Sequence, residues 1–258
     1  MKWYRHFTLF TCICFLFTGS CRAQIKLGIQ GGMSIPNLSG GTNEISQGYT
    51  SRFAPSFGIF GNYKLNQNIY LQAEINFDGQ GGQRNGIQPI TSSDIPIQPP
   101  NGYFYANFKN VSVLNYLEIP ITINYVFGNS SLRYFVDAGP YIGYLLNAKE
   151  VTSGISTIYI DKNGFPLMIP APPTYQTLAP VPPQSFDATT DVYSSLNKIN
   201  IGLTGGLGIL YPISTSQAII LKLKGMYGLT VIQKYSADGK SHTGNLVVEV
   251  GYEFKLGI

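Results

Sequence analysis

Residues that could do chemistry are scarce in this chain. It has two histidines, His6 and His242, and its three cysteines, Cys12, Cys14 and Cys21, all lie near the amino terminus. Zinc sites and thiol nucleophiles need His or Cys side chains gathered in one place. We therefore expect no metal site, no thiol chemistry and no cofactor in the remainder of the chain.

One short segment does hold an acid, a hydroxyl and an imidazole: Asp238, Ser241 and His242. A serine hydrolase needs these three groups hydrogen-bonded in series. Residues this close together in a loop more often form a solvated turn, so the sequence predicts a protein that is not an enzyme. A lipid-modifying enzyme is the third-ranked alternative. The stretch Asp161-Lys-Asn-Gly164 lacks the ligand ladder of a calcium loop and is expected to be a turn.

The amino terminus accounts for the cysteines. Residues 1–23 begin with basic residues, continue with an apolar run and end with small residues, which is the order of a secretory signal peptide. We expect cleavage after Ala23, with lipidation at Cys21 as the alternative. The mature chain, 24–258, is then a single domain with 14 basic and 13 acidic residues. This near-neutral charge gives no reason to expect nucleic acid as a partner.

The composition is unusual for a soluble domain. Only 12% of the residues are charged, whereas a soluble domain carries roughly 25%. That deficit argues against a cytosolic enzyme, whose surface needs mixed charges to stay soluble. Aromatic residues make up 13% of the chain, which is enough buriable surface to argue against disorder.

The dominant pattern beyond residue 24 is alternation of apolar and polar residues, the signature of a strand with two unlike faces. The stretch Ile69-Tyr-Leu-Gln-Ala-Glu-Ile-Asn-Phe-Asp78 is the clearest example. Eight such segments occur, and they lie at 25–35, 53–65, 69–78, 113–127, 132–146, 198–211, 219–230 and 245–258. Strands of roughly 10 to 15 residues suit a closed antiparallel barrel, so the sequence predicts an all-β, eight-stranded up-and-down barrel.

The two faces of these segments indicate which side is outside. The apolar face is large, with aromatic residues near the segment ends, whereas the polar face is crowded with glycine. A water-soluble barrel puts its apolar face inward, but a membrane barrel puts it toward lipid and keeps small and polar residues in a narrow lumen. We therefore predict a transmembrane barrel with its apolar face outward.

The connections between segments alternate in length. Those at 66–68, 128–131 and 212–216 are short, and the others, near 36–52, 79–111, 147–196 and 232–243, are long. Barrels of the Gram-negative outer membrane have short periplasmic turns and long extracellular loops. The sequence therefore predicts an integral outer-membrane protein whose apolar outer face contacts membrane lipid.

Six strand motifs, spread over the mature chain, carry a family resemblance: Lys26-Leu-Gly-Ile-Gln-Gly-Gly-Met33, Tyr70-Leu-Gln-Ala-Glu-Ile-Asn-Phe77, Asn115-Tyr-Leu-Glu-Ile-Pro120, Asp137-Ala-Gly-Pro-Tyr-Ile-Gly-Tyr144, Gly202-Leu-Thr-Gly-Gly-Leu-Gly208 and Gly251-Tyr-Glu-Phe-Lys-Leu-Gly-Ile258. Together they resemble the PorT-like outer-membrane β-barrel family of Bacteroidetes-type bacteria. The resemblance implies insertion by the outer-membrane assembly machinery, although the aromatic last residue that this machinery favours is replaced by Ile258. The namesake of the family serves a protein secretion system, which implies an accessory role in a secretion or surface assembly.

Every charged residue assigned to a strand lies on the polar, inward face. Seven basic and six acidic groups in a low-dielectric lumen must be paired, because an unpaired buried charge is very costly. We expect a structural, salt-bridged plug rather than an ion or proton path, with Glu118 and Arg133 as one pair. The set is Lys26, Lys64, Glu74, Asp78, Glu118, Arg133, Asp137, Lys198, Lys222, Lys224, Glu249, Glu253 and Lys255.

The glycines from Gly202 to Gly208 do not have the spacing of a phosphate loop. They fall within an alternating strand, where glycine often marks a close approach of other groups. We expect them to leave room for bulky lumen neighbours such as Tyr116 or Tyr141.

Two long loops are rich in proline and aromatic residues, the loop 147–196 and the tract Pro89–Tyr105. Proline stiffens an extended chain into a recognition surface, although a disordered or lumen-capping loop is the alternative. The candidate partner-binding residues are Phe165, Pro172, Pro173 and Tyr175. The predicted function is therefore non-enzymatic, a structural or partner-binding membrane protein whose partner is another envelope protein, with a small-solute channel as the alternative.

Overall fold

The computed structural model describes residues 25–90, 98–99, 102–129, 131–172 and 176–255. The predicted signal peptide, with cleavage after Ala23 or lipidation at Cys21, lies outside these residues. No helix among the described residues is long and apolar enough to cross a membrane, a finding that does not bear on spans made of strands.

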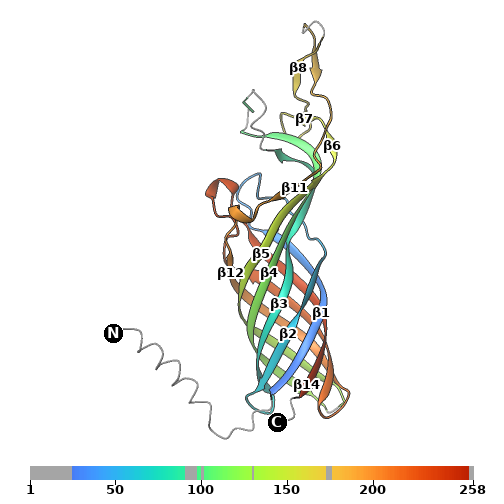
Figure 1. Ribbon diagram of the computed structural model, residues 1–258, viewed down its shortest axis with the longest axis vertical. Helices are drawn as coiled ribbons and strands as arrows, with labels where there is room; N and C mark the ends of the chain where they lie inside the picture. Colours follow the sequence, from blue (N-terminus) through green and yellow to red (C-terminus); the bar gives the residue numbers. More distant parts are fainter. Residues whose placement is uncertain (1–24, 91–97, 100–101, 130, 173–175, 256–258) are drawn as a thin grey trace, which may run out of the picture.

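Eight long strands form a closed antiparallel ring (Figure 1). They are β1 (Ile25–Ser39), β2 (Ala54–Lys64), β3 (Ile69–Ile90), β4 (Phe104–Gly128), β5 (Arg133–Ser153), β12 (Ile199–Pro212), β13 (Gln217–Gly228) and β14 (His242–Lys255). Each strand pairs with its neighbours in this order, and β14 pairs with β1 to close the ring. The predicted eight-stranded up-and-down barrel is confirmed.

The alternation of each strand divides its side chains between the lumen and the outer surface, as β3 illustrates. Ile75 is 48% exposed on the outside, whereas Glu74 and Asp78 are almost fully buried inside. The other long strands repeat this division, with isoleucine, leucine, valine and tyrosine outward. The predicted inversion, with the apolar face outside and the polar face inside, is confirmed.

Three strands continue well beyond the barrel. β3, β4 and β5 have 22, 25 and 21 residues, whereas β2 has 11. The β3–β4 ladder continues as far as Ile90 opposite Phe104. Parts of the predicted loops 79–111 and 147–196 are therefore strands. Backbone pairing continues through Gly81 and Gly86, both of which have positive φ values.

The protruding region, which we call the arm, comprises the described residues of 81–111 and 149–191 (Figure 1, top). It also contains the short strands β6 (Ile155–Ser156), β7 (Ile158–Tyr159), β8 (Met168–Pro170), β9 (Leu178–Pro180), β10 (Gln184–Ser185) and β11 (Ala188–Asp191). β11 pairs with β5, and β7 pairs with β4. Two 3₁₀ turns, η1 (Tyr193–Ser195) and η2 (Ser236–Asp238), lie at the rim of the barrel below it.

Glycines in the lumen make room for aromatic rings. A Cβ atom on Gly28 would lie 2.1 Å from the Phe60 ring, and one on Gly202 would lie 2.5 Å from Tyr141. Real Cβ atoms do not approach other atoms this closely, so the lumen packs only if these positions lack side chains. The prediction that Gly202 leaves room for Tyr141 is confirmed.

The pairing of Gly28 with Phe60 gives a direct test. We expect Gly28→Ala to lower the free energy of unfolding by about 1–3 kcal/mol, the usual cost of overpacking a core. Urea unfolding in detergent micelles measures this loss. Gly225→Ala is the matched control, because the nearest atom to its added Cβ lies 3.8 Å away. If the loss persists unchanged in a Phe60→Leu background, the ring is not its cause.

Candidate functional site

The centre of the lumen contains a network of buried ion pairs. β13 directs Lys222 and Lys224 inward. The Lys222 ammonium lies 3.0 Å from Glu74 Oε1 and 2.9 Å from Asp137 Oδ2. The Lys224 ammonium lies 3.0 Å from Glu249 Oε1 and 3.5 Å from Glu74 Oε2. Each lysine thus has two carboxylate partners, which offsets the desolvation of these charges.

Amide side chains also donate hydrogen bonds to the Glu74 carboxylate. Gln30 Nε2 and Asn76 Nδ2 donate to Glu74 Oε2 at 3.0 and 2.7 Å, and Gln72 Nε2 donates to Oε1. These donors come from β1 and β3, so side chains of three strands, β1, β3 and β13, bind the same carboxylate. Such a network fixes the relative height of the strands that contribute to it.

Asp78 and Glu118 also point into the lumen. Neither has an ion pair among the described residues. Both are fully buried, they are diagonal neighbours on the paired strands β3 and β4, and Gln80 Nε2 donates to Glu118 Oε1 at 3.0 Å.

The expected near-balance of charge is wrong for the middle of the lumen. The buried set there contains five carboxyl groups and two ammonium groups: Glu74, Asp78, Glu118, Asp137, Glu249, Lys222 and Lys224. The other predicted lumen cations lie at the two ends. Lys26, Lys64, Arg133 and Lys255 surround the end with the short turns.

Lys198 and the predicted Glu118–Arg133 pair also need correction. Lys198 precedes β12 and lies outside the lumen network, with its ammonium donating to the Tyr193 carbonyl and lying over the Tyr193 ring. On the β4–β5 ladder, Glu118 lies opposite Gly143 while Arg133 lies opposite Gly128. Arg133 starts β5, and Gly143 lies in the middle of that strand. At ~3.3 Å per residue, the distance along β5 from Arg133 to the level of Glu118 is roughly 30 Å, which is too long for an ion pair.

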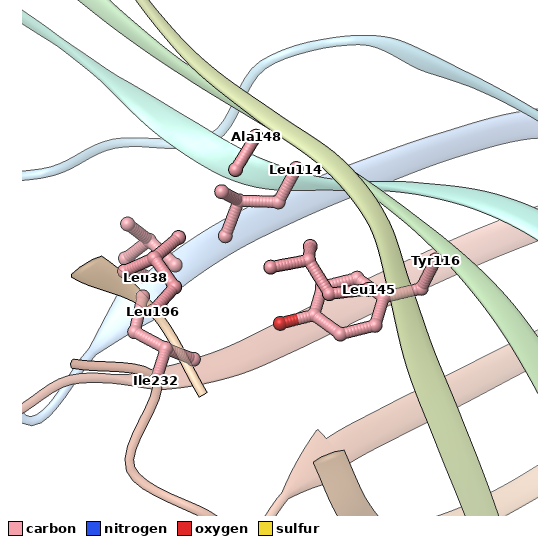
Figure 2. Close-up of a cluster of buried hydrophobic side chains, with 7 residues drawn as sticks. All are labelled: Leu38, Leu114, Tyr116, Leu145, Ala148, Leu196 and Ile232. Carbon is pink, nitrogen blue, oxygen red and sulfur yellow. The ribbon is translucent and has the colours of Figure 1, made fainter. Parts of the chain in front are cut away.

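Apolar side chains close the lumen on both sides of the charges. Phe60, Phe135, Leu210, Ala218 and Ile220 form the lower plug, between the charges and the short turns. The upper plug, on the arm side, draws side chains from β1, β4, β5 and the segments flanking β12 and β13 (Figure 2). Its members are Leu38, Leu114, Tyr116, Leu145, Ala148, Leu196 and Ile232. Buried apolar clusters therefore lie on both sides of the lumen charges.

A chamber of about 220 Å³ lies above the upper plug. Its lining includes Leu38, Leu196 and Ile232 from the plug, together with Tyr49 and Glu150. Burial raises the pKa of Glu150, partly opposed by the Arg84 guanidinium, and burial and then Glu150 raise the pKa of Tyr49 to about 12. Three side chains of the upper plug therefore also line this chamber.

The arm has a small core of its own. Phe104, Ile158 and Leu167 are buried there, with Ile169 and Val181 packed against them. Phe108 and Phe186 stack with ring centroids 5.0 Å apart. The described part of the proline-rich loop is therefore folded. Its two ends contribute to lumen capping, because Ala148 and Leu196 belong to the upper plug, whereas the part from Ile158 to Val181 packs in the arm.

The candidate partner-binding residues are only partly described. Phe165 is 61% exposed, and the Asp161 carboxylate accepts hydrogen bonds from the backbone N–H groups of Asn163 and Phe165 at 2.9 and 3.2 Å. The predicted turn at Asp161 is confirmed, and it holds Phe165 outward. Pro172 is exposed, while Pro173 and Tyr175 lie outside the described residues.

Asp238, Ser241 and His242 do not form a catalytic series. The Ser241 hydroxyl contacts Gln233 and the Ser46 carbonyl. His242 Nδ1 lies 3.1 Å from the Gly228 carbonyl, and its ring stacks on Tyr227. These contacts secure the loop between β13 and β14 to the rim of the barrel.

The sequence itself places the chain among known proteins, because the family described as "Outer membrane protein beta-barrel domain" matches residues 20–233. The chain belongs to this family. No curated protein matches it significantly. Because barrels of this membrane have short periplasmic turns and long extracellular loops, we expect the short turns to be periplasmic and the arm to be extracellular.

Solved structures similar to the chain are also outer-membrane barrels. Ail, the attachment invasion locus protein of Yersinia pestis, is 11% identical, with 90% of this chain and 99% of that chain covered and a TM-score of 0.40. OprG from Pseudomonas aeruginosa is 10% identical, with 92% and 98% covered and a TM-score of 0.41. The outer membrane protease OmpT from Escherichia coli is 11% identical, with 91% and 96% covered and a TM-score of 0.37.

The lysine network predicts unequal effects of two charge-removing substitutions. Lys224→Met leaves Glu74 and Glu249 short of a partner, and we expect it to cost about 3–5 kcal/mol of unfolding free energy. Glu118→Gln keeps the oxygen that accepts from Gln80 and removes a charge without an ion partner, so we expect a change below about 1 kcal/mol. Urea unfolding in micelles compares the two, and equal losses would contradict the assignment of charges.

Proposed function

We propose that this outer-membrane barrel is a non-enzymatic scaffold whose arm binds another protein of the cell envelope. The single observation that carries the proposal is the folded arm, which has a core of its own and is continuous with three barrel strands. A barrel that served only as a membrane anchor would need no such extension.

The tip of the arm offers an apolar surface for a protein partner. Phe165, Met168 and Leu178 are 61%, 42% and 64% exposed, and β8 and β9 form a hairpin that includes the last two. Exposed apolar side chains on a rigid element are typical of binding anchors. The resemblance of the strand motifs to PorT-like barrels supports an accessory role in a secretion or surface assembly.

The closed lumen argues against the second candidate function, a small-solute channel. We expect folded protein in planar lipid bilayers to show no steady unitary conductance, because two apolar plugs and bridged charges fill the lumen. An open porin, inserted under the same conditions, is the positive control. Steady conductance steps from the purified protein would overturn the scaffold proposal in favour of a channel.

Photocrosslinking tests the arm directly. A photoreactive residue at position 165 or 178 in native outer membrane should give one discrete protein adduct. The same residue at Gln47, exposed on the first extracellular loop, should not give that adduct. Deletion of 166–181 should abolish it while the barrel keeps heat-modifiable migration on gels. Equal adducts from position 47, or none from the arm, would contradict the proposal.

A further inference from the structure

The periplasmic mouth of the barrel gathers positive charge around a cavity. A space of about 210 Å³ is lined by Lys26, Lys64, Arg133 and Lys255, and Glu253 is the one acidic side chain of the described lining. The Lys26 ammonium is held by Glu253 at 2.7 Å. The other three cations have no ion pair among the described residues, so the mouth carries an excess of positive charge.

The strand register forces these like charges together. Lys26 on β1 lies directly opposite Lys255 on β14, and Lys64 ends the adjacent β2, two positions beyond the partner of Lys26. Like charges opposite each other on paired strands destabilise the pairing. An anion within the mouth would turn this repulsion into attraction.

Part of the remaining lining supplies neutral hydrogen-bond donors. Ser214, Thr215 and Ser216 from the β12–β13 turn and Gln217 at the start of β13 border the cavity. The Lys255 N–H donates to the Ser216 carbonyl at 2.7 Å, which ties this turn to the end of β14. Hydroxyl, amide, ammonium and guanidinium groups are the donors that bind phosphate oxygens.

The volume of the cavity limits the size of its ligand. Above it Phe135, Leu210 and Ile220 of the lower plug line a space of about 30 Å³, which is large enough only for water. The mouth itself is smaller than the ~300–1,000 Å³ of pockets for drug-sized ligands. It suits a single small anionic group.

We infer that the periplasmic mouth binds one phosphate group, held by Lys64, Arg133 and Lys255. The group belongs either to a free phosphate or to the head group of a phospholipid in the periplasmic leaflet. The site lies at the opposite end of the barrel from the arm and does not depend on the proposed scaffold function.

The test uses the full folded chain and two probes. Inorganic phosphate is titrated by calorimetry into protein in neutral detergent at constant ionic strength. Nanodiscs of phosphatidylcholine, with or without phosphatidylglycerol, are examined by native mass spectrometry for retained lipid. The mouth variant is Lys64→Gln/Arg133→Gln. The charge-matched control is Lys162→Gln/Lys240→Gln, which changes two exposed extracellular lysines.

We expect saturable binding that weakens about tenfold or more in the mouth variant, since that variant removes two of the three cationic hydrogen-bond donors. The control should bind as the unaltered chain does. Binding of inorganic phosphate supports a free anion, and retention of one phosphatidylglycerol with the same dependence on the mouth supports a head group. The inference is overturned if neither probe binds saturably, or if both variants weaken binding equally. Lys255→Gln, at the exposed end of β14, replaces the double variant if that variant lacks heat-modifiable migration.

Discussion

The pairing of β1 with β14, from Lys26 opposite Lys255 to Ser39 opposite His242, turns eight strands into a cylinder without an open edge. In hydrocarbon an unpaired backbone group finds no water, so this closure is what permits strands to span the membrane. It also assigns every residue of each strand to the lipid or to the lumen. A slip of one residue at this seam would exchange the two faces of the strand.

A ring of eight strands leaves a lumen so narrow that every inward side chain must be matched to those across from it. Phe60 fits because Gly28 has no side chain, and Tyr141 fits because of Gly202. The charges follow the same rule, since Lys222 and Lys224 each reach two carboxylates. Side chains thus fill much of the lumen, and both proposed binding surfaces lie at the ends of the barrel.

The alternation of apolar and polar residues predicted which face of each strand is inside. It did not predict which side chains lie at the same level along the barrel axis. The alternation around Glu74 and Asp78 was enough to place both in the lumen. It could not pair Glu118, because strand tilt and register, not chain proximity, decide which charges share a level. Phe60 and Leu145 interrupt the polar face, and such apolar interruptions were the available signal for the plugs. The register shift beside Tyr116 brings both Leu145 and Ala148 inward, which simple alternation does not allow.

The arm owes its orientation to the same ladders that form the barrel. A binding surface on a flexible loop must be ordered when its partner arrives, and that ordering weakens association. Here β3 and β4 remain paired from the lumen to Ile90 opposite Phe104, and β11 supports β5 beside them. The additional half of β3 raises the tip by roughly 35 Å at ~3.3 Å per residue. Leu178 belongs to the separate β8–β9 sheet, which packs against the long strands through Leu167, Ile169 and Val181. The proposed partner would therefore meet apolar anchors that the arm core holds on the membrane-embedded barrel.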